Sequence, residues 1–306
     1  MPPRPLDLLD LPTLYRWREE ALSLDAARRL TRGNPLSAAG MLAYLNPARH
    51  IYSAVQQVEG LTLLGGVIHS RGDSFARLLY LAPASGLTHP DLPSLIEHLA
   101  TEAGNWGAFH ILAEVDENSQ AFPALRAAGF SVYAWQRIWD LSAVPAQENA
   151  NGWQKVQSVH LPGIQNLHHQ IVPPLLQPIE PAPRRVTGLI CADGPRCYVN
   201  LTAGPEGIFL TPLIHPEATG VAEKLANLLS HLPDRRKRPV YLCMRSYQAW
   251  LEPVLADLGA QPGPRQAVMV KHLVRMVKDE QALRAAQPVQ VVPASRLNHP
   301  EQKPEK

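Results

Sequence analysis

The sequence predicts an α+β protein made of two similar domains in tandem, each a mixed, mostly antiparallel sheet flanked by helices. Three observations support this prediction. The chain has 306 residues, about twice the length of a typical domain. Apolar runs of strand length alternate with segments whose apolar residues recur at helical spacing. Several residues of the first half recur in the second half at a nearly constant sequence offset. We therefore expect a first domain at 1–145, a shorter and more divergent second domain at 152–278, and a flexible tail at 287–306.

The elements of the first half follow from apolar periodicity and turn residues. The clearest helix covers 92–103, where six apolar side chains recur at the spacing of one helix face. Gly60 is expected to close a hairpin, and Gly129 to end a second helix that Asn118 and Ser119 cap. The other expected elements are helices at 12–18 and 25–30, strands at 50–59, 61–70, 77–82 and 108–115, and a strand pair at 130–141.

The same order of elements returns after the polar stretch 143–152, which has the composition of a linker. A Leu-Pro pair at 161–162 marks the entry to a helix, as another does at 11–12. The remaining expected elements are a hairpin at 187–191 and 197–202, strands at 207–211 and 239–244, helices at 217–231 and 247–258, and a closing strand at 266–276.

Two sets of matching residues indicate that the halves arose by duplication. The sequence Leu-Ala-Pro at 81–83 matches Leu-Thr-Pro at 210–212, an offset of 129. A helix proline followed by a terminating glycine occurs at 123 and 129, and again at 253 and 259, an offset of 130. Because a proline inside a helix removes a backbone hydrogen bond, its recurrence favours duplication over coincidence. The alternative is a single larger α/β domain.

The second helix of the first half carries the pattern of a known family. The positions that fit N-x-x-A-x-x-x-Y-x-x-x-G-F are Asn118, Ala121, Gly129 and Phe130, with Leu125 at the tyrosine position. In these residues the chain resembles the GCN5-related N-acetyltransferases (GNAT), here in a tandem arrangement. The resemblance implies an acetyl-CoA-dependent N-acetyltransferase that acts on a small-molecule or peptide amine.

By this resemblance, acetyl-CoA is the cosubstrate and lies between two splayed strands, with its pyrophosphate at the start of the core helix. Backbone N–H groups at a helix start favour such an anion. The residues expected to contact it are Leu81, Ser85, Gly86, Leu87 and Asn118.

Two side chains are candidates for proton transfer in the cleft between those strands. Glu114 shares one face of its predicted strand with His110 and Leu112, and Tyr80 lies on the neighbouring strand. We therefore predict Glu114 and Tyr80 as the catalytic residues. The alternative is structural, with Glu114 at a solvated strand end and Tyr80 in the core.

Several positions depart from the family pattern. The loop at 84–93 has one glycine and no arginine, and it carries Asp91 and two prolines that lack N–H donors. The equivalent loop at 214–220 keeps Gly220 and offers His215, but it also carries Glu217. Both halves have leucine at the tyrosine position. A second hypothesis is therefore a non-catalytic binding or regulatory protein that has kept the fold and lost the acetyl-CoA loop.

Composition limits the other partners. A formal charge of +2 gives no electrostatic reason to expect nucleic acid. No apolar run reaches the length of a membrane span and no signal peptide pattern is present, so we expect no membrane association and a cytoplasmic location. The cysteines lack C-x-x-C spacing, and the histidine pair at 168–169 has no third ligand at helical spacing, so no metal site is expected. The oligomeric state is left open.

Overall fold

The computed structural model describes residues 1–37, 49–147, 152–232, 235 and 238–273. The predicted tail at 287–306 lies outside these residues, as do part of the predicted linker and the end of the predicted closing strand. Within the described ranges, no helix is both long and apolar enough to cross a bilayer.

The helices and strands of the first half follow the predicted order, with one correction and two additional two-residue strands, at 4–5 and 22–23, that were not predicted. The strands are β1 (Arg4–Pro5), β2 (Leu22–Ser23), β3 (Arg49–Val58), β4 (Leu61–Ser70), β5 (Phe75–Ala82), β6 (His110–Asp116) and β7 (Ser131–Asp140). The helices are α1 (Leu11–Trp17), α2 (Ala26–Arg32), α4 (Leu92–Asn105) and α5 (Ala121–Ala127). Gly60 has a positive φ of 71° and closes the hairpin between β3 and β4, as predicted. The strand pair predicted at 130–141 is wrong: these residues form the single strand β7, because both of its edges pair with strands distant in sequence.

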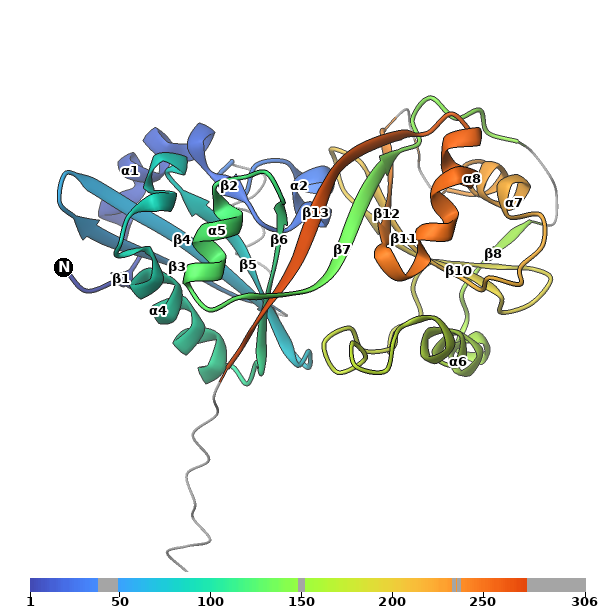
Figure 1. Cartoon of the computed structure of the whole chain (residues 1–306), viewed down its shortest axis with the longest axis horizontal. Helices are drawn as coiled ribbons and strands as arrows, with labels where there is room; N and C mark the ends of the chain where they lie inside the picture. The colour runs from blue at the N-terminus through green and yellow to red at the C-terminus, as the bar shows by residue number, and fades with distance from the viewer. Residues whose placement is uncertain (38–48, 148–151, 233–234, 236–237, 274–306) are drawn as a thin grey trace, which may run out of the picture. The chain divides into compact units, whose positions relative to one another are not determined.

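Helix α4 covers one face of the first-half strands and fills the core predicted for it. All six apolar side chains of its predicted stripe are buried. Pro93 stands in the first turn, where its missing N–H has no intrahelical partner to lose. The apolar face packs against β3 and β4 (Figure 1). Burial of this stripe contributes six side chains to the hydrophobic core of the first half.

The second half repeats this order, with a shorter core helix and shorter hairpin strands. Its strands are β8 (Trp153–Lys155), β9 (Leu189–Cys191), β10 (Cys197–Ala203), β11 (Ile208–Ile214), β12 (Val240–Arg245) and β13 (Gln261–His272). Its helices are α6 (Leu161–Ile171), α7 (Val221–Leu228) and α8 (Glu252–Asp257). The helix predicted at 217–231 is shorter because Gly220, with φ of 62°, begins it in a left-handed conformation. The residues predicted as a helix at 247–258 form a 3₁₀ helix, Ser246–Leu251, with non-helical angles at Gln248 inside it, followed by α8.

The predicted duplication is visible in the backbone. Gly129 and Gly259 have φ angles of 84° and 80°, so each ends its helix in the left-handed region that favours glycine. Leu125 and Leu255, which share the position of the family tyrosine, are both fully buried. The tandem arrangement is thereby confirmed.

Within the described residues the strands form one mixed sheet. Its order is β1-β3-β4-β5-β6-β13-β7-β12-β11-β10-β9-β8, with β2 pairing to β5. Neighbours are antiparallel except for β5 with β6 and β11 with β12. Each of these two parallel pairs extends over only three residue pairs before the strands diverge. The α+β class and the mostly antiparallel sheet are confirmed.

The two halves exchange their last strands. Strand β13, at the end of the second half, pairs with β6 of the first half. Strand β7, at the end of the first half, pairs with β12 of the second half. The exchanged strands also pair with each other and run side by side through the centre of the sheet (Figure 1). Both halves consequently belong to one compact unit.

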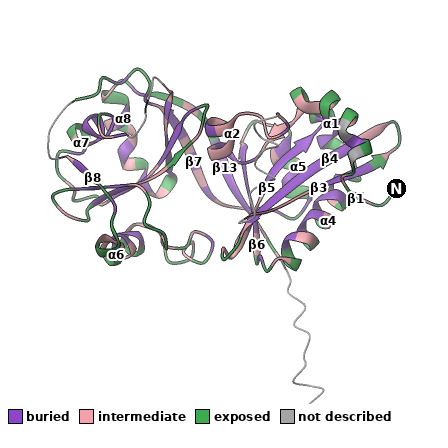
Figure 2. Ribbon diagram, turned by 180° about the vertical axis from the view of Figure 1, so that it is seen from behind, coloured by how far each residue is buried: buried purple, intermediate pink, exposed green. Residues whose placement is uncertain are grey.

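Each hydrophobic core includes side chains from the strand of the other half. The core around α4 contains Ala267 and Met269 of β13, both with 0% exposure. The core around α7 contains Trp139 of β7 and Leu141 just after it. Figure 2 shows that the strands of both halves are largely buried where helices cover them. Each core depends on a strand that the other half supplies.

The exchange predicts that the first half does not fold alone. A fragment of residues 1–145 lacks β13, so it leaves an edge of β6 unpaired and removes Met269 from the core. We expect this fragment to show no cooperative thermal unfolding by circular dichroism, and to regain a transition when mixed with residues 152–306. A fragment that unfolds cooperatively at the melting temperature of the intact chain would contradict this expectation. The same experiment tests the predicted domain boundaries.

Candidate functional site

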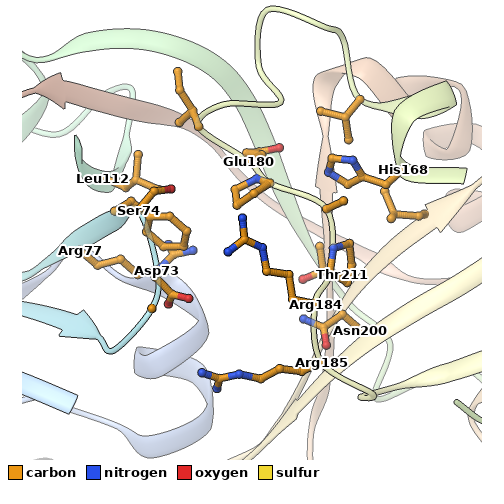
Figure 3. Close-up of a pocket in the computed structure, with 18 of the residues that line it drawn as sticks. Asp73, Ser74, Arg77, Leu112, His168, Glu180, Arg184, Arg185, Asn200 and Thr211 are labelled. Atoms are coloured by element: carbon orange, nitrogen blue, oxygen red, sulfur yellow. The ribbon is translucent and has the colours of Figure 1, made fainter. Parts of the chain in front are cut away.

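A cavity of about 760 Å³ is lined by residues of both halves. One wall comes from β5, β6, β7 and the loops beside them. The other comes from α6, the segment at 179–187, and the strands β10 to β12 (Figure 3). Because β7 and β12 are hydrogen-bonded neighbours, the sheet itself holds the two walls together.

Two arginines enter the cavity where parallel strands diverge. Arg77 is the last residue of β5 that pairs with β6, and Arg245 is the last residue of β12. Their side chains are 31% and 11% exposed, respectively. Each is the single charged residue of its strand, so each needs an oppositely charged partner inside the protein.

Two carboxylates supply these partners. Nε of Arg245 lies 2.8 Å from Oε1 of Glu180, and its Nη2 lies 3.8 Å from Oε1 of Glu114. Nη1 of Arg77 lies 3.5 Å from the same oxygen of Glu114. Arg245 also donates a hydrogen bond to the side-chain carbonyl of Gln136. Every buried charge of this network therefore has an opposite charge beside it, as buried ions require.

Glu180 fastens an irregular segment to the sheet. Its two carboxylate oxygens accept hydrogen bonds from the hydroxyls of Tyr133, at 2.9 Å, and Tyr247, at 2.8 Å. Burial alone would raise the pKa of Glu180, but Arg245 and the two hydroxyls outweigh burial and lower this pKa below its usual value. Burial likewise opposes the charge of Arg245, and Glu180 is the main group that keeps the pKa of Arg245 above its usual value. The carboxylate thus stays ionised and holds its segment against β7 and the end of β12.

Other polar groups of the cavity lack partners in the described part of the chain. Arg184 and Arg185 extend from their segment toward the wall that carries Asp73 (Figure 3), and neither forms an ion pair with a described carboxylate. The buried Nδ1 atoms of His69 and His168 make no hydrogen bond. Arg184 and Arg185 are exposed and can be solvated, whereas buried polar atoms without partners are rare, so the two histidine nitrogens mark the cavity as a place for a polar ligand or water.

The space where β5 and β6 diverge is filled by the chain itself. Strand β2 pairs with β5, and the next residue, Leu24, bridges both strands. Its N–H donates to the carbonyl of Leu79 at 2.9 Å, and its carbonyl accepts from the N–H of Glu114 at 2.9 Å. The side chain of Glu114 also accepts from the N–H of Ala26 at 3.0 Å. We call residues 22–26 the inserted segment.

The inserted segment is fixed at its far end by the start of α2. The carboxylate of Asp25 accepts from the N–H of Arg28 at 3.1 Å and lies 3.2 Å from its guanidinium. Leu24 itself is 1% exposed. Within the inserted segment, Leu24 therefore belongs to the hydrophobic core and Asp25 caps the start of α2.

In the second half a side chain fills the corresponding space. Oε1 of Gln248 accepts from the N–H of Ile214 at 3.0 Å, and its Nε2 donates to the carbonyl of Pro212 at 2.9 Å. Gln248 is 1% exposed. Strands β11 and β12 therefore diverge around one glutamine amide rather than around a length of main chain.

The loops at the helix starts do not fit a pyrophosphate. A Cβ added to Gly86 would lie 2.4 Å from Cδ2 of Leu63, so this glycine allows close packing on β4 rather than approach of an anion. At Gly220 a Cβ would lie 3.8 Å from a carboxylate oxygen of Glu223, which repels phosphate. The chain also fills the two spaces where parallel strands diverge, between β5 and β6 (the first-half groove) and between β11 and β12 (the second-half groove). The residues present therefore do not fit acetyl-CoA in the manner that the family resemblance implies.

The structure places the predicted site residues as follows. Tyr80 is fully buried and donates a hydrogen bond to Oγ of Ser53 at 2.9 Å, while Glu114 is 8% exposed. Both lie on the strands that diverge, but the inserted segment separates them. Among the predicted cofactor contacts, the buried residues are Leu81, Gly86 and Leu87, and the exposed residues are Ser85 and Asn118. The structure does not gather these residues around an open groove, and their functional roles stay predictions.

The sequence did not single out the residues that the cavity brings together. Arg77 and Arg245 carry a recognisable signal, because each is a lone charge in an apolar strand. Glu180, Arg184 and Arg185 lie in an irregular, proline-rich segment where no periodicity identifies an inward-facing side chain.

The order of elements in each half, with a parallel strand pair that diverges beside a core helix, defines an acyltransferase-like α+β fold. It is the fold of the GCN5-related N-acetyltransferases, in tandem. A member from Sphaerobacter thermophilus superposes with a TM-score of 0.52 at 13% identity, covering 89% of this chain and 96% of that one. A tandem GNAT protein from the clavulanic acid biosynthesis pathway, solved without acetyl-CoA, gives 0.51 at 18% identity, covering 89% and 98%. A putative acetyltransferase from Pyrococcus horikoshii gives 0.51 at 9% identity, covering 88% of each chain.

No family model and no curated protein matches the sequence. At such low identities, the solved structures establish the fold of this chain and leave its substrate open.

The variant Glu180→Gln tests the ion network. Because it leaves the buried Arg245 without its nearest charge, we expect a loss of about 3 kcal/mol in the free energy of unfolding at neutral pH. The pKa of Glu180 is lowered in the folded protein, so the stabilisation is present above the unfolded-state pKa of about 4.3 and is lost as the pH falls further. The difference between the wild type and the variant should therefore shrink in acid, measured by urea denaturation across this range.

Glu252→Gln is the matched control, since Glu252 pairs with Arg137 at a site where the two side chains are 33% and 37% exposed. We expect the control to cost at most about 1 kcal/mol. Equal losses for the two variants would contradict the central role of Glu180.

Proposed function

We propose that this protein is a non-catalytic, small-molecule-binding protein that has kept the acetyltransferase fold, with its ligand site in the cavity between the halves. The observation that carries the proposal is the inserted segment, which is hydrogen-bonded to both strands of the first-half groove. The inserted segment occupies the space in which the family resemblance predicts acetyl-CoA.

Opening the first-half groove is costly. Leu24 would lose its burial, worth about 1.5–3 kcal/mol for such a side chain. The N–H of Glu114 and the carbonyl of Leu79 would also lose their partners, at about 1–3 kcal/mol for each buried group left unsatisfied. A ligand arm would have to replace all of these contacts. The first half is therefore the less suitable place for an acyl donor.

One observation favours acetyl transfer as a second candidate function. The side chain of Gln248 occupies the groove of the second half, and its amide makes one donated and one accepted bond to β11. An amide of the acetyl-CoA arm could make the same pair of bonds once that side chain has turned away. The acceptor, a small-molecule or peptide amine, would then enter from the cavity, where β11 contributes Thr211 and Leu213.

Calorimetric titration with acetyl-CoA separates the two candidates. For the binding protein we expect no heat from the intact chain at millimolar acetyl-CoA, and no release of thiol with a panel of amines. Micromolar binding, strengthened in Gln248→Ala and accompanied by thiol release, would instead establish acetyl transfer in the second half. Gln154→Ala is the control, because Gln154 is exposed on β8, outside the groove and the cavity.

A further inference from the structure

The cavity between the halves has an excess of positive charge. Among the described residues, its charged lining consists of four arginines and two carboxylates, namely Arg77, Arg184, Arg185, Arg245, Asp73 and Glu180. Glu180 forms an ion pair with Arg245, and Arg77 forms one with Glu114. This leaves Arg184 and Arg185 facing a single carboxylate, Asp73, with which neither forms an ion pair.

Further arginines lie beside this pair. Arg49 begins β3 and is close enough to Arg32 and Arg185 for their charges to oppose its own. Burial first, and then Arg32, lowers the pKa of Arg49, while Asp25 and Asp73 oppose this shift. Cations that repel each other in a partly buried site are stabilised when an anion binds among them. The electrostatic potential around Arg32, Arg49 and Arg185 therefore favours the binding of an anion.

The remaining lining suits an organic body. Aromatic and aliphatic side chains occupy the first-half wall, namely Phe75, Trp106, Phe109, Leu112 and Tyr133. His69 and His168 are each 4% exposed, and their Nδ1 atoms, which have no hydrogen-bond partner among the described residues, can form hydrogen bonds with polar atoms of a ligand. A volume of about 760 Å³ is in the range of sites for small molecules.

We propose that the cavity binds an organic oxyanion, with a carboxylate or phosphate group held by the guanidinium groups of Arg184 and Arg185 and the apolar part against the aromatic wall. Guanidinium groups bind either oxyanion through two parallel hydrogen bonds. Glu180 serves this site by holding the segment that carries both arginines (Figure 3). The inference rests on the proposed function, because it takes the cavity as the ligand site.

The test is calorimetric titration of the full chain with phenyl phosphate, benzoate and the neutral benzyl alcohol. We expect at least one of the two anions to bind, benzyl alcohol not to bind, and added salt to weaken the binding. The double variant Arg184→Ala/Arg185→Ala should weaken it by about tenfold or more, given the strength of charge-assisted hydrogen bonds. The control is Arg126→Ala/Arg196→Ala, which removes two exposed arginines outside the cavity.

Failure of both anions to bind at millimolar concentration, or equal affinities in the double variant and the control, would overturn the inference. A different result would refute the proposed non-catalytic function. Acetyl-CoA binding that persists in Arg184→Ala/Arg185→Ala would place a donor in a groove and refute the non-catalytic account, whatever the result with the aryl anions. The relative affinities of phenyl phosphate and benzoate distinguish a phosphate ligand from a carboxylate ligand.

Discussion

Two strands that diverge inside a protein leave backbone N–H and C=O groups that must find partners, and this requirement shapes the whole molecule. In the first half the main chain of Leu24 satisfies both strands, and in the second half the amide of Gln248 satisfies β11. In an acetyltransferase of this fold the acyl donor is expected in that space. Here the chain's own atoms occupy that space, with Leu24 in the first half and Gln248 in the second, as the proposed non-catalytic role requires.

Because β7 and β13 are exchanged, the cavity is lined by residues of both halves and lies between them. Because the two strands pair with each other and with opposite halves, they make one continuous sheet from two duplicated units. The cavity lies where the walls of those units face each other, and Arg245, Glu180 and Tyr133 connect the walls. A site built in this way could not exist in either half alone.

The local features of the fold could be predicted from sequence, whereas its long-range pairings could not. The stripe of α4, the hairpin at Gly60 and the terminating glycines at 129 and 259 have periodic or conformational signals within a few residues. Strand β2 has two residues, too few to show any periodicity, so the filling of the first groove had no signal. The strand exchange depends on which distant edges meet, and the partners of Glu180 depend on the folding of an irregular segment. The family resemblance indicated where parallel strands diverge, but it could not show that the chain itself fills the space between them.

Amide hydrogen exchange of the inserted segment tests the central claim most directly. Exchange of the Leu24 and Glu114 amides, followed by mass spectrometry or NMR with and without millimolar acetyl-CoA, reports whether these hydrogen bonds persist. The account predicts protection as strong as that of the α4 core and unchanged by acetyl-CoA. Rapid exchange of these amides, or protection that acetyl-CoA alters, would show that the first groove opens to a donor and would contradict the account.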